Sequence, residues 1–558
     1  MGEVKKRNSP MTSRLLLTLP PLALATVAAF FLFSRLRFSP LPWPDSAAVL
    51  LTGMKLVSLH PHWDPELSSL GPLLPLISGL FSALGVNQIF GSSLAMRLLG
   101  IIPLLVSAWT LWHWVGTRLE GLGLRARHAY SLSAVAASGL LLDPTARWGA
   151  LISRPEAWVG MCWILLLREL DCLEQIESAN RRESGVLLRG AGESATTAGQ
   201  DIPPRFWIIA ALFSAALGFD RNAWLLFPAL LVGLARIPNW WRVSVRTALL
   251  SLPWILHYGV YPAPPGAANT LGYAPGSLGT ISGLVDGLFL ELPGVDLASP
   301  VMMSAKILFW LLLGGLLSLL GFEFARIVAE FRRTRHMERR GSSQMLVLSA
   351  SAAFLWIFYL WSIREDAWLG MLTHFLAWGW VGALMIRLAT QGMQRTPLAF
   401  RFFAALTSLA ALAALGSWVS VMRTAALFPT AYSSENLRQW NDCVERSIGS
   451  AQSGRPLKIW QAFLPDALAE AALRFKDIEI NHAPQPSANL DVLLINQVMS
   501  ENLAEKYEGP ERPEDRTNLQ RLQQRNAMQL GSLEQLNWKV CHYGPFWIDI
   551  GIRSGHAS

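Results

Sequence analysis

Charged residues are scarce in this chain: Asp, Glu, Lys and Arg make up 15% of its 558 residues, while hydrophobic residues make up 52%. A soluble globular domain carries roughly a quarter charged residues, so the deficit excludes a single soluble domain and predicts a polytopic membrane protein. The 24 Trp and 33 Pro agree with this prediction. Trp favours membrane interfaces, and Pro is tolerated in packed membrane helices.

Three other features that the sequence lacks exclude further classes of protein and site. The chain has only four cysteines, Cys162, Cys172, Cys443 and Cys541, and none has a metal-binding spacing. The basic residues behind the net charge of +8 are scattered through short loops rather than gathered in a stripe, which excludes nucleic acid as a partner. A clear cleavage site is also lacking after the apolar run from Leu15 to Phe33. We therefore expect that run to be a retained first span.

The rule that cytoplasmic loops collect Lys and Arg orients the apolar runs. With the basic N-terminus inside, the chain is expected to cross the cytoplasmic membrane about eleven times, leaving the tail from Ser420 outside. The exterior loop 261–300 holds no Lys or Arg, as this topology requires, and Arg168 to Arg205 is predicted to be an interior flexible loop. The spans expected after the first are Leu94 to Val115, Tyr130 to Leu142, Trp158 to Leu167, Phe206 to Phe219, Ala223 to Ala235, Ala248 to Val260, Val301 to Phe322, Met345 to Trp361, Ala367 to Ile386 and Phe402 to Val419.

The tail differs in character from the rest of the chain. The segments KIWQAF, DIEIN, LDVLLIN, WKVCHYG and FWIDIGI have the composition of short strands, and helical patterns stand between them. We therefore predict two domains, a membrane domain over residues 1–419 and a small extracytoplasmic α/β domain over residues 420–558. Cys443 and Cys541 both belong to the second domain. An oxidising exterior would pair them, and two free thiols are the alternative.

The first exterior loop, residues 35–93, contains an acid at an unusual place. Asp45 follows the rigid turn LPWP just beyond the first span, and an amphipathic pattern from Ser46 predicts a helix lying on the membrane surface. The apolar stretch from Leu70 to Gly85 is interrupted by Pro75 and is expected to lie at the interface or to be re-entrant. Asp45 can cap the surface helix, which is the plainer interpretation, and a capping carboxylate can also face a cavity.

This topology gathers ionisable residues of both signs on one side of the membrane. Such residues are costly near the bilayer and usually face the protein interior. A wet cavity holding arginines and carboxylates suits a reaction in which Arg binds a phosphate and a carboxylate handles a proton. The residues expected at the exterior ends of spans are Asp45, His60, His62, Asp64, Glu66, Arg154, Glu156, Asp220, Arg221, Arg364, Glu365 and Asp366.

Each of these residues also has a plainer interpretation. Arg154 can extend to the lipid headgroups, and Asp220 with Arg221 can form an ordinary pair at a helix end. The stretch HPHWDPE, with His62 and Asp64, has the look of a divalent-cation site, although exposed loops of this composition also occur without a metal. No cofactor is predicted with certainty, and a divalent cation is the one alternative.

Four features together resemble a known superfamily. They are LPWPDSA after the first span, a surface helix followed by GPLL, Arg97 within SLAMRLLG, and SRPE at 153–156. With them the chain resembles the polytopic GT-C glycosyltransferases, and in particular bacterial aminoarabinose and mannosyl transferases. The resemblance is best from Leu15 to Asn222. Beyond that it covers the general plan of many spans followed by an extracytoplasmic α/β tail.

The resemblance implies transfer of a sugar from a polyprenyl-phosphate carrier to a lipid, glycan or protein acceptor on the outer side of the membrane. Asp45 matches the essential acid of the first exterior loop and would activate the acceptor hydroxyl for attack with inversion. Arg154 and Arg364 would neutralise the departing phosphate. The remaining expected substrate-binding residues are Arg97, Glu156, Asp64 and His62.

Two departures from the family pattern stand in the same loop. Many relatives have a second acid directly after the first, where this chain has Ser46. Relatives also often place a Lys before the proline of the loop's second half, where this chain has Leu70 and Gly71. The alternative functions are a transporter or lipid flippase with an exterior-facing polar cavity, and a non-catalytic envelope scaffold. The two halves of the chain show no internal sequence repeat, and this counts against the transporter.

Overall fold

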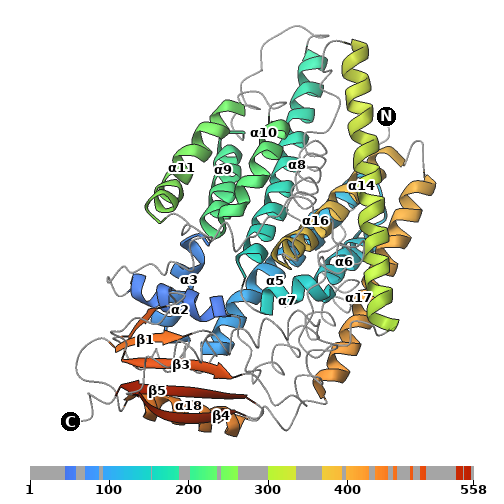
Figure 1. Cartoon of the computed structure of the whole chain (residues 1–558). Coiled ribbons are helices and arrows are strands. Elements are labelled where there is room, and N and C mark those ends of the chain that lie inside the picture. Colours follow the sequence, from blue (N-terminus) through green and yellow to red (C-terminus); the bar gives the residue numbers. More distant parts are fainter. Residues whose placement is uncertain are drawn as a thin grey trace.

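The computed structural model describes the chain in segments. They are residues 44–57, 70–86, 92–151, 154–187, 202–234, 240–261, 300–334, 367–392, 397–426, 434–449, 457–461, 478–481, 491–497, 536–543 and 546–553. The spans expected at Leu15 to Phe33 and Met345 to Trp361 lie outside them. Figure 1 shows a bundle of long helices with a small sheet at one end.

The bundle is built from helices of very different length. Its members are α5 (Ser92–Gly121), α6 (Ala126–Leu142), α7 (Pro144–Leu151), α8 (Pro155–Leu187), α9 (Ile202–Phe219), α10 (Phe227–Leu234), α11 (Trp240–Val260), α14 (Pro300–Thr334), α16 (Ala367–Gly392) and α17 (Pro397–Ala426). The central member is α16, which packs against α5, α6, α7, α8, α14 and α17. Its apolar stretch Leu372–Thr390 is 94% buried, because apolar side chains cover it on every side.

Two of the described helices are long and apolar enough to cross a membrane by length and composition. They are Ala95–Gly121 of α5 and Leu372–Thr390 of α16. Further apolar helices are shorter, as at Pro204–Phe219 and Met303–Ser318. The described residues therefore support a mostly helical chain, with fewer spans of full length than the sequence predicted.

Several helix boundaries differ from the sequence prediction. The expected loop from Arg168 is helical up to Leu187, because α8 continues through it. α11 begins at Trp240, so Arg242 and Arg246 are helical residues and not loop residues. The run expected from Ala223 is broken into a 3-10 turn, Arg221–Leu226, followed by the short α10. α8 and α11 therefore include polar residues that lie outside the apolar runs from which the helices were predicted.

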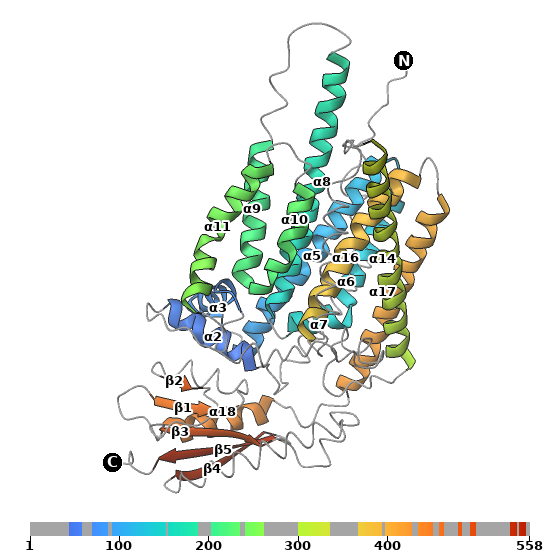
Figure 2. The same cartoon turned by 45° about the horizontal axis from the view of Figure 1, so that its top comes forward.

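A pair of short helices, α2 (Pro44–Val57) and α3 (Leu73–Ala83), lies across the end of the bundle nearest the sheet (Figure 2). The two helices touch at glycines. A Cβ added to Gly53 would lie 2.0 Å from the carbonyl oxygen of Pro75, and one added to Gly79 would lie 2.1 Å from that of Gly53. Only glycine permits this approach, so the helix pair depends on both positions.

The tail folds into the predicted α/β unit. Its strands are β1 (Leu457–Gln461), β2 (Ile478–Asn481), β3 (Val492–Gln497), β4 (Leu536–Tyr543) and β5 (Phe546–Arg553), in the order β2-β1-β3-β5-β4. β1 pairs in parallel with β2 and β3, whereas β5 is antiparallel to both β3 and β4. All five predicted strands are present in the described residues.

Helix α18 (Ser434–Gly449), which the sequence prediction missed, packs on β4 and β5. The predicted disulfide is confirmed, since Cys443 of α18 is bonded to Cys541 of β4. This bond joins residues 98 apart in sequence and fastens the helix to the sheet. The bundle's last helix, α17, runs to Ala426, past the boundary expected after residue 419.

Candidate functional site

The end of the bundle that faces α2 and α3 carries the residues expected to form a site. Asp45 is the second residue of α2, so the predicted helix is present and begins two residues earlier than the sequence predicted. The acid therefore lies in the first helical turn, where a carboxylate is favourable to the helix dipole. Its side chain lies outside the described residues. The catalytic role expected for it stays a prediction.

The chain entering α3 is held against the bundle by backbone contacts. Leu70 forms a β-bridge with Asp220, and the Gly71 amide donates to the carbonyl oxygen of Phe219 at 2.9 Å. The phenol of Tyr258 donates to the carbonyl oxygen of Leu217 at 2.6 Å beside this joint. The α2–α3 pair is thus attached to α9, and Asp220 serves as part of the attachment with a buried side chain.

The SRPE motif forms a buried ion pair at the start of α8. The Nε of Arg154 donates to Oε2 of Glu156 at 3.2 Å, and Nη2 donates to Oε1 at 3.0 Å. Both side chains are less than a tenth exposed. Arg154 therefore does not extend to lipid headgroups, and its two-point contact with Glu156 holds the guanidinium in one orientation.

A second buried polar group centres on Asp143, between α6 and α7. Its Oδ1 accepts the amides of Thr145 at 3.0 Å and Ala146 at 2.9 Å, while its own carbonyl oxygen accepts the amide of Arg147. The sequence DPTA explains this arrangement: Asp is a favoured helix cap, and Pro144 suits the first helical position because it needs no amide donor. α7 begins at this point for a local reason.

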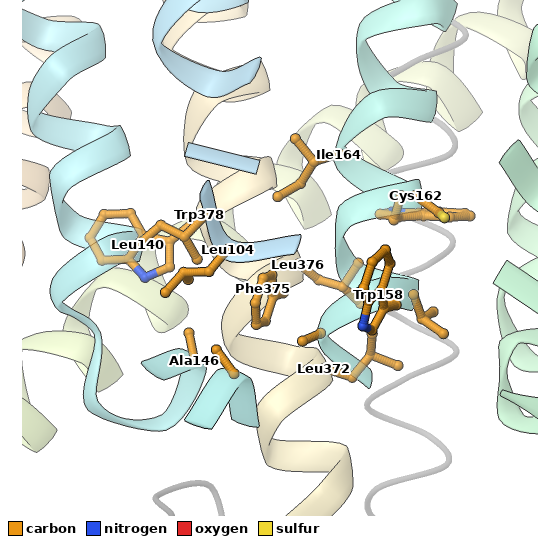
Figure 3. Close-up of a cluster of buried hydrophobic side chains, with 14 of the residues drawn as sticks. Leu104, Leu140, Ala146, Trp158, Cys162, Ile164, Leu372, Phe375, Leu376 and Trp378 are labelled. Atoms are coloured by element: carbon orange, nitrogen blue, oxygen red, sulfur yellow. The ribbon is translucent and has the colours of Figure 1, made fainter. Parts of the chain in front are cut away.

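The other oxygen of Asp143 binds the central helix. Oδ2 lies 2.8 Å from Nδ1 of His374 and accepts Nε1 of Trp378 at 3.0 Å. His374 stacks on Phe309 with ring centroids 3.8 Å apart. Figure 3 shows Trp378 on α16 beside Leu140 of α6, with Ala146 of α7 nearby. One carboxylate therefore ties α6 and α7 to α16.

Space for Trp378 comes from a glycine. A Cβ added to Gly139 would lie 2.1 Å from the indole ring of Trp378, which is far inside contact distance. The indole can therefore lie flat against α6 only because position 139 has no side chain. This contact places the indole nitrogen where it can reach Asp143.

The surroundings of Asp143 act on its pKa in opposite directions. Burial by itself raises it, whereas the electrostatic effect of His374 and the hydrogen bonds with His374, Ala146 and Trp378 lower it. The lowering effects prevail, so the pKa lies below its ordinary value of 3.8. Asp143 is therefore a carboxylate at neutral pH, and its four donors account for its stability in the interior.

Arg147, on the first turns of α7, is the least satisfied charge of this region. Its side chain is 1% exposed, and its Nε and Nη1 atoms have no hydrogen-bond partner. Burial lowers the pKa of Arg147 to about 10, and nearby Asp143 opposes this effect without accepting a hydrogen bond from those two atoms. The guanidinium is thus a cation at neutral pH with unused donors. Thr145 of the same helix also has a buried hydroxyl with no partner.

The remaining expected residues are placed as follows. Arg97 is buried on α5, 6% exposed. His62, Asp64 and Arg364 lie outside the described residues, and so does the rest of HPHWDPE. Within the described part of the chain, no group of three or more His, Cys, Asp or Glu could hold a metal ion. The structure thus brings Arg154 and Glu156 together, and the cation alternative stays a prediction.

Sequence reasoning missed the group of Asp143, Arg147, His374 and Trp378. One signal was available: His374 is an ionisable residue inside an apolar helix, and such residues are functional candidates by default. Its partner was not available, because 231 positions separate His374 from Asp143. The partnership follows from the packing of α16 against α6 and α7.

Comparisons with known proteins bear on the fold. No family model and no curated protein match the chain. The crystal structure of ArnT from Cupriavidus metallidurans bound to undecaprenyl phosphate is 11% identical, with a TM-score of 0.50 over 98% of this chain and 100% of that one. The apo state of the same protein is 12% identical, with a TM-score of 0.46 over 97% of this chain and 98% of that one.

The first likeness extends over both the helical bundle and the α/β tail. At this identity it concerns the arrangement of the backbone alone, and it leaves substrate and chemistry open. It agrees with the layout predicted from the sequence, in which many helices are followed by a small sheet. The chain therefore shares with ArnT a backbone arrangement of many helices followed by a small sheet.

Proposed function

We propose that the protein is a membrane glycosyltransferase that moves a sugar from a polyprenyl-phosphate carrier to an acceptor. The observation that carries the proposal is the likeness in fold, over nearly the whole chain, to a protein solved with undecaprenyl phosphate bound. A polyprenyl phosphate joins a long apolar tail to an anionic head. Such a donor needs apolar surface for the tail and cationic groups at one end of the bundle for the head.

The outward faces of the bundle support a membrane location. Large apolar side chains are exposed along α11, where they lie on the side away from α9. Soluble proteins rarely leave so much apolar surface uncovered, and lipid is the natural cover for a helical bundle. The exposed apolar residues of α11 are Trp241, Val245, Leu249, Leu252, Ile255, Leu256 and Val260.

In the proposed reaction Asp45 accepts the proton of an acceptor hydroxyl as that oxygen attacks the anomeric carbon of the donor sugar. The new bond joins acceptor oxygen to anomeric carbon. The bond from that carbon to the carrier phosphate breaks, and its electron pair leaves with the phosphate. Attack from the opposite side gives inversion. Asp45 lies on α2, which Figure 2 shows at the end of the bundle nearest the sheet.

The phosphate role first expected for Arg154 needs revision in the proposal. Glu156 already binds both Nε and Nη2 of Arg154 in a buried pair. A phosphate that took these same two donors would have to displace a carboxylate and leave that carboxylate buried without its partner, which is costly. Arg154 and Glu156 are better suited to hold the turn between α7 and α8 in shape.

Sugar transfer by the purified full chain tests the proposal. With a radiolabelled polyprenyl-phosphate sugar and membrane lipid extract as acceptor, the wild-type protein should release polyprenyl phosphate and label an acceptor. Asp45→Asn should lower the rate by about 100-fold or more, because general base catalysis contributes that much. Asp442→Asn, on exposed α18, is the matched control and should transfer sugar at the wild-type rate.

Two results would count against this function. Transfer by Asp45→Asn at the wild-type rate would remove the assigned base. Movement of intact donor across vesicles, with no cleavage of the sugar–phosphate bond, would indicate a lipid flippase in place of a transferase.

A further inference from the structure

Most buried charged side chains in the described part of the chain have a hydrogen-bond or ion-pair partner. Arg147 differs from them because two of its nitrogen atoms have none. Its Nε and Nη1 atoms are buried and have no partner, although they carry N–H groups of a guanidinium. Leaving charged donors in the interior without acceptors is costly, so each such group in a native protein calls for an explanation, and a bound anion is one.

Neutralisation by Asp143 does not explain these free donors. That carboxylate is near enough to act on Arg147 through its charge. Its hydrogen-bonding capacity is already used, because Oδ1 accepts two amides of α7 and Oδ2 contacts the side chains of His374 and Trp378. Asp143 is therefore a structural tie between helices, and Arg147 keeps unused donors beside it.

The position of Arg147 in the fold matches the head of a lipid ligand. α7 lies at the end of the bundle that faces α2, α3 and the sheet (Figures 1 and 2). The Arg154–Glu156 pair begins the next helix, seven residues along the chain from Arg147 to Arg154. The complement of unused donors on a positively charged guanidinium is an anion rich in acceptor oxygens.

We propose that Arg147 is the anchor of an anion site that takes a phosphate group. The chemistry fits because a phosphate accepts several N–H and O–H bonds at once and carries the opposite charge to the guanidinium. A phosphate can reach the site as the head of a polyprenyl phosphate or as free inorganic phosphate. That the phosphate belongs to a polyprenyl carrier rests on the proposed function. The existence of an anion site at Arg147 does not depend on that function.

Equilibrium binding by the full chain in detergent tests the site without any sugar transfer. The probes are a short-chain polyprenyl phosphate, the matching polyprenol without phosphate, and inorganic phosphate. The variants are Arg147→Met, Arg147→Lys and, as the matched control, Arg127→Met on the exposed start of α6. Thermal unfolding and native mass spectrometry report binding.

The wild type and Arg127→Met should bind polyprenyl phosphate and discriminate against polyprenol. Arg147→Met should weaken phosphate binding by about tenfold or more, because charge-assisted hydrogen bonds are lost, and Arg147→Lys should keep part of the affinity because it keeps the charge. Competition by inorganic phosphate would identify a site open to free anion. Binding of the lipid phosphate alone would identify the carrier head as the ligand.

Stability without ligand separates this role from a structural one. Removing a buried charge that lacks hydrogen-bond partners should leave ligand-free Arg147→Met as stable as the wild type or more so. Loss of stability with unchanged phosphate binding would show that Arg147 serves only to balance Asp143, and would overturn the site. Equal binding of phosphate and polyprenol by the wild type would overturn it too. Arg147→Lys answers the same questions if Arg147→Met does not fold.

The outcomes of the two proposals are distinguishable. Phosphate binding that depends on Arg147, with no sugar transfer, would retain the anion site and reject the transferase. Sugar transfer with phosphate binding unchanged in Arg147→Met would retain the transferase and reject this anchor.

Discussion

The first half of α8, from its start at Pro155 to Asp171 in the middle of the helix, treats buried charge differently at its two ends. At the far end, Asp171 accepts hydrogen bonds from Trp114 at 2.9 Å, from Arg118 at 2.7 Å and from Gln175 at 3.2 Å. Close by, Arg205 donates to Glu169 at 2.6 Å. At the near end, about 22 Å away at 1.5 Å per helical residue, lie the Arg154–Glu156 pair and Arg147.

The exposure of the cations separates the two ends. Arg118 is 25% exposed and Arg205 is 31% exposed, so water shares in their solvation. Arg154 and Arg147 are almost wholly buried, and Arg147 has unused donors. The far end therefore has the features of a structural clamp on α5, α8 and α9. At the near end Glu156 pairs with Arg154, and Arg147 keeps the unused donors on which the proposed anion site rests.

The largest effect is expected from breaking the near-end pair. Glu156→Ala should destabilise the protein by about 3–5 kcal/mol, because it leaves Arg154 buried without its carboxylate. Denaturant unfolding followed by tryptophan fluorescence measures this change. The double variant Arg154→Met with Glu156→Leu should recover most of the loss, since it removes both charges at once.

The same measurement at the far end sharpens the comparison. Arg118→Met should cost roughly 1 kcal/mol, because Arg118 is partly hydrated and Asp171 keeps Trp114 and Gln175 as donors. A cost at Arg118 equal to that at Glu156 would contradict the distinction between the two ends.

An effect between those of Glu156→Ala and Arg118→Met is expected from filling the space beside Trp378. Gly139→Ala should cost about 1–3 kcal/mol, because the new methyl group overlaps the indole and pushes it away from Asp143. Gly121→Ala, at the far end of α5, is the control, since nothing lies within 4 Å of the added Cβ. The same unfolding measurement applies, and equal effects of the two substitutions would refute the role given to Gly139.

The smallest effect is a pH dependence that belongs to the near end. The pKa of Asp143 is lower in the folded protein than its ordinary value of 3.8, so the stability it contributes is present above that value and is lost as the pH falls below it. Unfolding temperature measured from pH 6 to pH 3 should show this loss in the wild type. Asp143→Asn should show less of it, whereas exposed Asp442→Asn should behave as the wild type does. Identical pH profiles for all three would remove Asp143 as the source.

Much of the fold was accessible to sequence reasoning, because it depends on local pattern. Apolar runs located the bundle helices, and alternating residues located all five strands of the tail. Helix ends were less predictable. α8 continues to Leu187 through a polar stretch, since Asp171 and Glu169 find partners on neighbouring helices there. These partners lie on other helices, so no local sequence pattern around Asp171 and Glu169 predicts them.

The candidate site was predictable only in part. The motif SRPE marked Arg154 and Glu156, and their pairing two residues apart is nearly local. Sequence reasoning did not single out Asp143, although DPTA has the residues of a helix cap, and its bonds to His374 and Trp378 join distant helices. The predicted roles of His62, Asp64 and Arg364 stay predictions, because these residues lie outside the described part of the chain.

The sequence by itself determined the helical class and the strands of the tail. These features follow from composition, periodicity and the preferences of single residues. Only the tertiary structure decided that Asp143 is fully bonded, that Glu156 occupies Arg154 and that Arg147 keeps unused donors. The physical reason is that hydrogen bonds between helices depend on which faces pack together, and that packing is a property of the whole bundle.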